Sequence, residues 1–402
     1  MKYFYATSAR VPGIKAHCSQ IAQMCRSFQN AGVDIELLHP NRAKLPVYES
    51  KSIKEWYGFD QDVPVQALNC VDLLSRLPAG LPGIIYQLAF NLMTGTFNRS
   101  LIKYIKQYQG EFVFYTRDLR VFPKLAESFP EVKKIMEFHH LEESPGSTYD
   151  AESKIISAAT GIVVLTSPMK EMLVERGYSP EKVLVESSAV DPETFPGGIT
   201  SGDARARLKL SEQGKIVAYI GNFHTLGLEK GLDTIVQSIP MVTREYQDVS
   251  FYFVGGPMDY AASYISSLQD SGVDSRHYNF FDRQAYKDIY LWLAAADVLV
   301  MPLPDHPRFS KNTSPMKIFE YMTSGRPMVI SDLPAFRDVL KHEHNALMVP
   351  SNNTAAFAEA VLRLLQDSRL AGELAKNARN DVQHSTWDER AKRITQWIEA
   401  LG

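Results

Sequence analysis

One stretch, residues 312–327, constrains the fold of this chain more than any other. It reads NTSPMKIFEYMTSGRP and predicts a loop, a short helix and an abrupt stop. Ser314 suits the N-cap because its hydroxyl can accept a hydrogen bond from a first-turn N–H group, and Pro315 suits the first helical position. Gly325 can take the left-handed conformation that ends a helix, and Pro327 prevents continuation. The stretch therefore predicts a short helix with defined ends.

Apolar runs flank this helix on both sides. Residues 296–302 (ADVLVMP) precede it and residues 327–331 (PMVIS) follow it, a pattern typical of buried parallel strands. This order places the helix N-terminus at the carboxyl edge of a parallel sheet, where α/β proteins bind ligands and where the helix dipole attracts phosphate. Glu320 lies farther along the helix, within reach of paired ribose hydroxyls. An ordinary α/β helix with good caps explains the same residues equally well.

The length and composition predict a globular protein of two domains. The chain has 402 residues, of which 45% are hydrophobic and 22% charged. Its net charge of −3 gives no general attraction to nucleic acid. Three cysteines without metal-ligand spacing favour a reducing cytosol and predict no metal site. We find no signal-peptide or membrane-spanning pattern and expect a cytoplasmic protein.

Strand and helix patterns alternate along the whole chain and predict an α/β fold. A segment rich in Pro, Gly and Ser, residues 187–202, is the best linker candidate. We therefore expect one domain over residues 1–195 and a second over residues 205–385. Residues 386–402 form an amphipathic pattern and predict a helix that crosses back to the first domain.

The loop after the first strand carries candidate ligand-binding residues. Gly13 is a single glycine, so it indicates either a phosphate site or a plain turn. Arg10, Lys15 and His17 share the loop and can meet an anionic or polyhydroxy ligand. This loop is therefore a candidate ligand site.

Two other features of the first half have both a functional and a structural interpretation. His139 and His140 end a strand, where a ring faces the ligand crevice of a parallel sheet or is simply packed. Residues 81–95 are unusually apolar and precede several basic residues. They form either a membrane-facing surface or, more commonly, a helix packed on the sheet.

In the second half, the strand over residues 215–220 leads into Gly221, and Lys230 stands just before a helix. A lysine beside the N–H groups of a helix N-terminus is a good phosphate partner, although a solvated surface lysine fits the sequence equally well. Gly255 and Gly256 end the next strand and let a ligand or a backbone come close.

These motifs together resemble the retaining glycosyltransferases of family 4, the glycosyl transferases group 1. The resemblance in the second half is carried by the segments just described and most specifically by residues 314–331. The first half matches more loosely, through Gly13, residues 137–139, residues 164–167 and residues 188–191. The resemblance implies an α/β GT-B fold of two Rossmann-like domains with a ligand cleft between them, the acceptor on the first and the nucleotide sugar on the second.

The resemblance also implies roles for individual residues. Glu320 would bind the ribose hydroxyls, Lys230 would contact the diphosphate, and His139 would lie near the donor sugar, with His140 as the alternative if the register differs by one. The acceptor-side residues that it implies are Arg10, Lys15, His17 and His140. The further donor-binding residues that it implies are Gly13, Gly221, Asn222, Gly255, Asn312, Thr313, Ser314, Pro315 and Met316.

The chain departs from the family pattern at two of these positions. The first of two family glutamates spaced eight apart falls on Asn312, and a frequent arginine falls on Asn222. Lys230, the N-terminus of the helix after Ser314, and Arg308 or Lys311 would then carry more of the diphosphate charge.

The function implied is transfer of a hexose, with retention, from a nucleotide-diphosphate sugar to a hydroxyl of a glycan, lipid-linked or small-molecule acceptor. The front-face mechanism needs no metal and no cofactor. Polysaccharide biosynthesis is the commonest setting, with peripheral contact at the inner membrane face as a further expectation. Two alternatives remain: a GT-B epimerase or hydrolase that consumes donor without acceptor, and a non-catalytic protein that binds sugar nucleotides or glycans.

Overall fold

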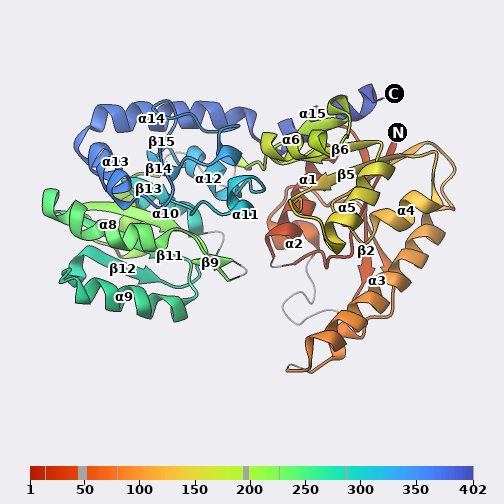
Figure 1. Cartoon of the computed structure of the whole chain (residues 1–402), viewed down its shortest axis with the longest axis horizontal. Helices are drawn as coiled ribbons and strands as arrows, with labels where there is room; N and C mark the ends of the chain where they lie inside the picture. Colours follow the sequence, from red (N-terminus) through yellow and green to blue (C-terminus); the bar gives the residue numbers. More distant parts are fainter. Residues whose placement is uncertain are drawn as a thin grey trace. The chain divides into compact units, whose positions relative to one another are not determined.

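The computed structural model describes residues 1–13, 15–43, 52–78, 80–192, 199–225, 227–285 and 288–401 (Figure 1). Its contacts divide the chain into two compact units. Unit 1 comprises Met1–Glu186 with Trp387–Gly402, and unit 2 comprises Ser187–Thr386. The division therefore falls at the start of the expected linker, and the final helix is part of unit 1.

Unit 1 contains a fully parallel sheet of seven strands in the order β3-β2-β1-β4-β5-β6-β7. Its strands are β1 (Lys2–Ala6), β2 (Asp34–Asn41), β3 (Val65–Asn69), β4 (Phe112–Thr116), β5 (Lys133–Phe138), β6 (Gly161–Val164) and β7 (Val183–Val185). Its helices are α1 (Ala16–Asn30), α2 (Ile53–Tyr57), α3 (Gly83–Ile105), α4 (Phe122–Ser128), α5 (Ser147–Ala158), α6 (Ser167–Glu175) and α15 (Trp387–Ala400).

Unit 2 contains a second parallel sheet, of six strands, in the order β12-β11-β8-β13-β14-β15. Its strands are β8 (Lys215–Ile220), β11 (Val249–Val254), β12 (Tyr278–Phe281), β13 (Val298–Met301), β14 (Met328–Ser331) and β15 (Leu347–Val349), with a separate hairpin of β9 (His224–Thr225) and β10 (Leu228–Glu229). Its helices are α7 (Ser201–Leu208), α8 (Leu232–Glu245), α9 (Ala261–Asp270), α10 (Ile289–Ala295), α11 (Pro307–Ser310), α12 (Met316–Ser324), α13 (Thr354–Gln366) and α14 (Ser368–Asp381).

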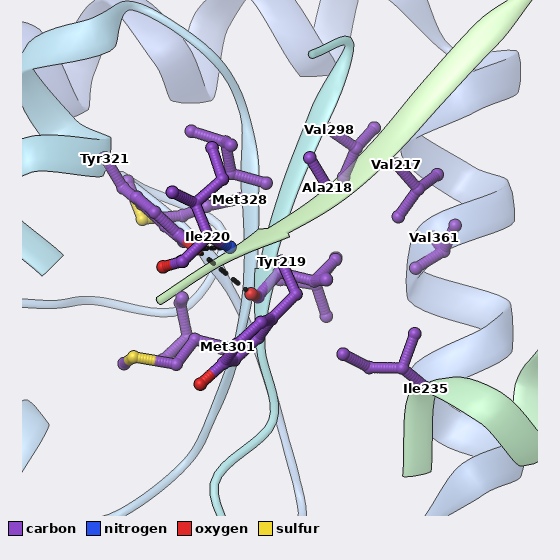
Figure 2. Close-up of a cluster of buried hydrophobic side chains, with 14 of the residues drawn as sticks. Val217, Ala218, Tyr219, Ile220, Ile235, Val298, Met301, Tyr321, Met328 and Val361 are labelled. Atoms are coloured by element: carbon purple, nitrogen blue, oxygen red, sulfur yellow. Dashed lines mark hydrogen bonds between the residues drawn. The ribbon is translucent and has the colours of Figure 1, made fainter. Parts of the chain in front are cut away.

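The central strands of unit 2 explain the apolar runs in the sequence. Every residue of β13 and β14 is buried, because helices cover both faces of a doubly wound sheet. Figure 2 shows side chains of β8 and β13 packed together with Ile235 of α8 and Val361 of α13. Burial of this cluster fixes the strands whose carboxyl ends carry the site described below.

The last helix packs within unit 1. Its side chains Trp387, Ile394 and Ile398 are buried, as an amphipathic pattern predicts. Arg390, on the same helix, is fully buried as well and forms an ion pair with Glu137 of β5. Unit 1 is thus built from both ends of the chain.

Helix α3 has two different halves. Its later residues Phe97 and Leu101, which lie beyond residues 81–95, are buried in a cluster with Phe4 and Phe114 of the sheet. Within residues 81–95, Met93 is buried as the packed-helix interpretation expects. Its first turns extend beyond the sheet (Figure 1) and leave Ile84 and Leu88 65% and 62% exposed. Ile84 and Leu88 therefore form an exposed apolar surface on this part of α3.

Candidate functional site

The topology of unit 2 locates a ligand site at one point of its sheet. The chain passes from β8 to β11 on one side and later to β13 on the other, so the strand order reverses between β8 and β13. Open α/β sheets bind ligands at the carboxyl ends of strands at such a reversal. The loop after β8 begins with Gly221, and the loop after β13 leads to α12. The helix of the 312–327 stretch therefore starts at this edge, as the sequence predicts.

A close approach of Lys317 explains the glycine after β8. Gly221 has a φ of +146°, and a Cβ atom built on it would lie 2.1 Å from Nζ of Lys317. The next strand ends in Gly255, whose Cβ would lie 2.4 Å from the carbonyl oxygen of Gly221. The two glycines thus make room for each other and for one lysine side chain.

The start of α12 differs from the expected capping. The helix begins at Met316, the N-cap position is Pro315, and no side chain caps it. Ser314, expected as the cap, instead accepts a hydrogen bond from the backbone N–H of Ser188 at 2.9 Å. The first-turn N–H groups are consequently left without a side-chain acceptor, which suits an anion.

Three charged side chains interact at this edge. Lys317 lies with Nζ 4.0 Å from the centroid of the Tyr219 ring, a cation–π contact. Burial, together with the charge of Lys230, holds the pKa of Lys317 well below its ordinary value. Burial also lowers the pKa of Lys230. It raises the pKa of Glu320 to about 7, against the opposing effect of Lys317. Two lysines held close together, each destabilised as a cation, favour the binding of a dianionic group.

The N-terminus of α8 is already occupied, contrary to expectation. Glu229 accepts hydrogen bonds from the backbone N–H groups of Leu232 and, at 3.3 Å, Asp233. Lys230 therefore does not stand beside unoccupied helix amides. Any diphosphate contact at this point must come from its ammonium group and from α12.

Tyr321 fixes α12 against the end of β8. Its hydroxyl accepts a hydrogen bond from the backbone N–H of Ile220 at 3.0 Å, and Figure 2 shows the two residues side by side. The hydroxyl also lies 3.4 Å from the carbonyl oxygens of Ile220 and Val300. One side chain therefore positions the helix that carries Lys317 and Glu320 relative to both strands of the switch point.

The two positions that depart from the family pattern lie in different surroundings. Asn312 is only 3% exposed, while Thr313 beside it is half-buried. Asn222 has an exposed side chain, and its carbonyl oxygen accepts the hydroxyl of Tyr219 at 2.7 Å. The Tyr219 ring thus supports both Lys317 and the loop after Gly221.

In unit 1, the strand-end His139 belongs to a buried polar network. Its Nε2 lies 2.7 Å from Oε1 of Glu137, which also pairs with Arg390 at 2.9 Å and accepts the hydroxyl of Tyr115. Burial alone would raise the pKa of Glu137, but Arg390 and His139 outweigh it and keep the carboxyl ionised. Burial and the charge of Arg117 lower the pKa of His139 to about 4. The neutral ring therefore donates through Nε2–H to Glu137 and presents Nδ1 as an acceptor.

The other predicted residues of unit 1 are placed as follows. Gly13 is tightly packed, since a Cβ there would lie 2.7 Å from Sγ of Cys18, and its N–H donates to the Tyr57 hydroxyl at 3.0 Å. This gives Gly13 a packing role. His140 pairs with Glu142 at 3.2 Å. A single cavity of unit 1 is lined by Arg10, Gly13, Lys15 and His17 together.

Two further properties concern the described residues only. Among them, no three His, Cys, Asp or Glu side chains are grouped so as to hold a metal ion. No helix in the described ranges combines the length and the apolar character needed to cross a membrane.

Comparisons with known proteins place part of unit 2 in a glycosyltransferase family. Residues 214–367, inside unit 2, match the family model of the glycosyl transferases group 1, which confirms the resemblance to that group. An uncharacterized glycosyltransferase of Methanocaldococcus jannaschii is 25% identical over 265 residues, covering 61% of this chain and 64% of that protein. A D-inositol 3-phosphate glycosyltransferase of Corynebacterium urealyticum is 23% identical over 267 residues, covering 64% of this chain and 60% of that protein. Both alignments span less than two thirds of the relatives' own length.

Solved structures agree over the whole chain. Sucrose-phosphate synthase from Thermosynechococcus elongatus superposes with a TM-score of 0.74 at 18% identity, covering 100% of this chain and 98% of that chain. The Anabaena protein HepE, in complex with UDP and glucose, gives a TM-score of 0.72 at 14% identity, with both chains fully covered at 100%. The expected α/β GT-B fold, with two Rossmann-like units, is thereby confirmed.

Proposed function

We propose that this chain, whose second unit contains a domain of the glycosyl transferases group 1, is a glycosyltransferase that takes a hexose from a nucleotide-diphosphate sugar. One observation carries the proposal. Lys230, Lys317 and Glu320 meet at the switch point of the unit 2 sheet, beside a helix N-terminus that no side chain caps. A nucleotide-diphosphate sugar offers the two groups that suit them, a diphosphate and a ribose diol.

The diphosphate would lie against the two lysines and the first turn of α12. Both lysines are destabilised as cations when no ligand is bound, so an anion between them relieves that cost. Glu320 would accept hydrogen bonds from the ribose hydroxyls. Solved neighbours contain UDP or UDP-glucose, which makes a uridine nucleotide the first donor to test.

The same groups account for a metal-independent front-face reaction with retention. The bond from the sugar C1 to the diphosphate oxygen breaks, and the lysines and helix amides stabilise the negative charge on the leaving group. The acceptor hydroxyl forms the new bond on the same face of the sugar and gives its proton to the departing phosphate oxygen. His139, with Nδ1 as an acceptor, is a candidate to hold a donor-sugar hydroxyl. No cofactor is needed, and a chelator should leave the rate unchanged.

The acceptor is a glycan, lipid-linked or small molecule bound by unit 1, in a cytoplasmic setting such as polysaccharide assembly. Peripheral membrane contact is a further part of the proposal, supported by the exposed apolar residues Ile84 and Leu88 at the start of α3. Replacement of these two residues by serine should reduce co-sedimentation with liposomes.

A thermal-shift screen with UDP, GDP, ADP and their hexose conjugates tests the donor site. A ligand present at 100 times its Kd stabilises the native state by about 2.7 kcal/mol, which corresponds to a shift of roughly 5–10 °C for domains of this size. Glu320→Gln should lose most of the shift, whereas the matched control Glu373→Gln, at an exposed position of α14, should keep it. Stabilisation by none of these nucleotides would refute the proposed donor site. Donor consumption without acceptor would instead support the epimerase or hydrolase alternative.

A further inference from the structure

A basic cavity at the sheet edge of unit 1 is not explained by donor binding in unit 2. Its volume is about 720 Å³. It lies at the carboxyl ends of β1 and β4, where the strand order of the unit 1 sheet reverses, because the loops after these strands line it. The topology that places the donor site in unit 2 therefore places a second ligand site here.

The lining of this cavity is strongly cationic. Among the described residues that line it, five have Arg or Lys side chains and one, Asp118, has a carboxylate; the basic residues are Arg10, Lys15, Arg42, Arg117 and Arg120. The whole chain has a net charge of −3, so the cluster is a local feature and not a consequence of a basic protein.

The one carboxylate is engaged in holding the loops. Asp118 accepts hydrogen bonds from the backbone N–H of Ser8 at 2.7 Å, from the Ser8 hydroxyl at 2.5 Å and from the backbone N–H of Arg120 at 3.0 Å. These bonds tie the loop after β4 to the loop after β1. Asp118 therefore holds the cavity loops together, and its carboxylate already accepts three hydrogen bonds.

Side-chain contacts hold the cations in place and leave much of their charge uncompensated. Arg117 donates to the neutral amide of Gln20, and the Arg120 guanidinium lies 4.4 Å from the centroid of the Phe90 ring. Within the described ranges, no carboxylate lies within ion-pair distance of Lys15, Arg117 or Arg120.

A second pair of arginines is linked through one carboxylate. Nε of Arg42 lies 3.4 Å from Oδ2 of Asp72, and the same oxygen accepts the Ser75 hydroxyl at 2.5 Å. Arg10 in turn donates to Oγ of Ser75 at 3.0 Å. One carboxylate thus orients two guanidinium groups on this wall of the cavity.

We propose that this cavity binds a phosphate group of the acceptor substrate, an inference that rests on the proposed transferase function. Lys15, Arg117 and Arg120 contact the phosphate, and Arg10 with Arg42 contacts it from the opposite loop. Guanidinium groups match phosphate oxygens in pairs, so several of them in one pocket favour a phosphate over a neutral hydroxyl ligand. The cavity is large enough for a sugar phosphate or for the head group of a phosphorylated lipid.

The structure is compatible with two sources of that phosphate. Phe90 of the cavity wall lies on α3, the helix whose first turns expose Ile84 and Leu88. A lipid phosphate would place its apolar chains on that surface, whereas a soluble sugar phosphate would not use it. The shared chemistry is the phosphate, and the experiment below separates the two sources.

The test uses the full chain saturated with UDP, so that the donor site is occupied. Binding of glucose 1-phosphate, glucose 6-phosphate and glucose is measured by calorimetry, and co-sedimentation is measured with phosphatidylcholine vesicles with and without phosphatidic acid. The double variant Lys15→Gln/Arg120→Gln is compared with Lys106→Gln/Lys124→Gln, which removes the same charge from exposed positions outside the cavity.

Each outcome decides the proposal. Binding of a hexose phosphate that weakens roughly tenfold or more in the cavity variant alone supports a soluble acceptor. Sedimentation with phosphatidic acid that is lost in that variant alone supports a lipid acceptor. If neither probe binds, or if both double variants behave alike, the proposal is overturned. UDP binding itself is measured first, so failure of the donor site is seen separately from failure of this cavity.

Discussion

The affinity for a nucleotide-diphosphate sugar should pass through a maximum as pH changes. Glu320 has a pKa of about 7 in the unliganded protein because burial disfavours its charge. Binding of ribose hydroxyls requires the carboxylate. Below about pH 7 the side chain is protonated, and donor binding has to release that proton, so the affinity rises with pH and levels off above about 7.

The fall in affinity on the acidic side of the maximum, called the acid limb here, follows in size from the pKa of Glu320. If the bound carboxylate stays ionised, lowering the pH from about 7.5 to about 5.5 weakens donor binding roughly 25-fold, or about 1.9 kcal/mol. The phosphates of UDP-glucose do not titrate in this range, because the diphosphate is a diester. The pH dependence of the affinity therefore reports the titration of a protein group.

The alkaline limb has the opposite sign and comes from Lys317. Its pKa is lowered in the unliganded protein by burial and by Lys230, and a bound diphosphate raises it by favouring the ammonium form. A group whose pKa rises on binding contributes less affinity as the pH passes above its unliganded pKa. Donor binding should therefore weaken again at alkaline pH.

Calorimetric titration with UDP-glucose from about pH 5.5 to about pH 9 tests both limbs. Glu320→Gln should remove the acid limb and Lys317→Met the alkaline limb, while Glu373→Gln should leave the profile unchanged. A flat acid side in the parent protein, or an acid limb that persists in Glu320→Gln, would refute the assignment of Glu320.

Two predictions concern stability. Arg390→Met leaves the carboxylate of Glu137 buried without its guanidinium partner, and removal of one member of a buried pair should lower the free energy of unfolding by about 3–5 kcal/mol, measured by urea denaturation. Gly231→Ala should also destabilise the fold, and by more than strain alone, because Gly231 has a φ of +87° and the new Cβ would lie 1.9 Å from the carbonyl oxygen of Pro302.

Each stability prediction has a control in the same chain. Arg369→Met breaks an exposed ion pair with Glu373 and should change the free energy by roughly 0–1 kcal/mol. Gly272→Ala places a Cβ at a φ of +70° with nothing within 4 Å, so it should cost only the roughly 1–2 kcal/mol of left-handed strain. If Gly231→Ala lowers the free energy of unfolding no more than Gly272→Ala does, the predicted clash is contradicted. If Arg390→Met lowers it no more than Arg369→Met does, the role of the buried ion pair is contradicted.

Buried parallel strands were predictable because their signal is local. The runs that became β8, β13 and β14 are apolar at nearly every position. The edge strand β3 (Val65–Asn69) gives no such signal, since most of its side chains are exposed and only its pairing with β2 defines it.

Helix-capping residues in the sequence predict the helix ends of this chain only in part. Thr200 and Asp203 form a capping box that starts α7 at the end of the segment that composition predicts to be a linker. Ser314 has the chemistry of an N-cap but does not cap α12. Its hydroxyl instead accepts a hydrogen bond from the backbone N–H of Ser188. Local capping preferences are worth about 1 kcal/mol, so one tertiary hydrogen bond is enough to override them.

The charged residues of the site required the fold. Lys317 follows Met316 in an ordinary helical pattern and has no feature that separates it from a surface lysine. It becomes part of the site because Gly221, at the end of β8, leaves space for its side chain. Lys15 and Arg120 meet in one cavity only because β1 and β4 are neighbours in the sheet.

The sequence by itself determined the α/β character, the buried strands, and the helix from Met316 to Ser324 with its glycine end. Periodicity and turn chemistry depend on near neighbours in the chain, so these elements can be read from residues in order. The tertiary structure alone decided which charges meet: Lys230 with Lys317 and Glu320, and the five basic side chains of the unit 1 cavity. Electrostatic interactions depend on distance and burial in space, and residues far apart in sequence acquire these only when the sheets have formed.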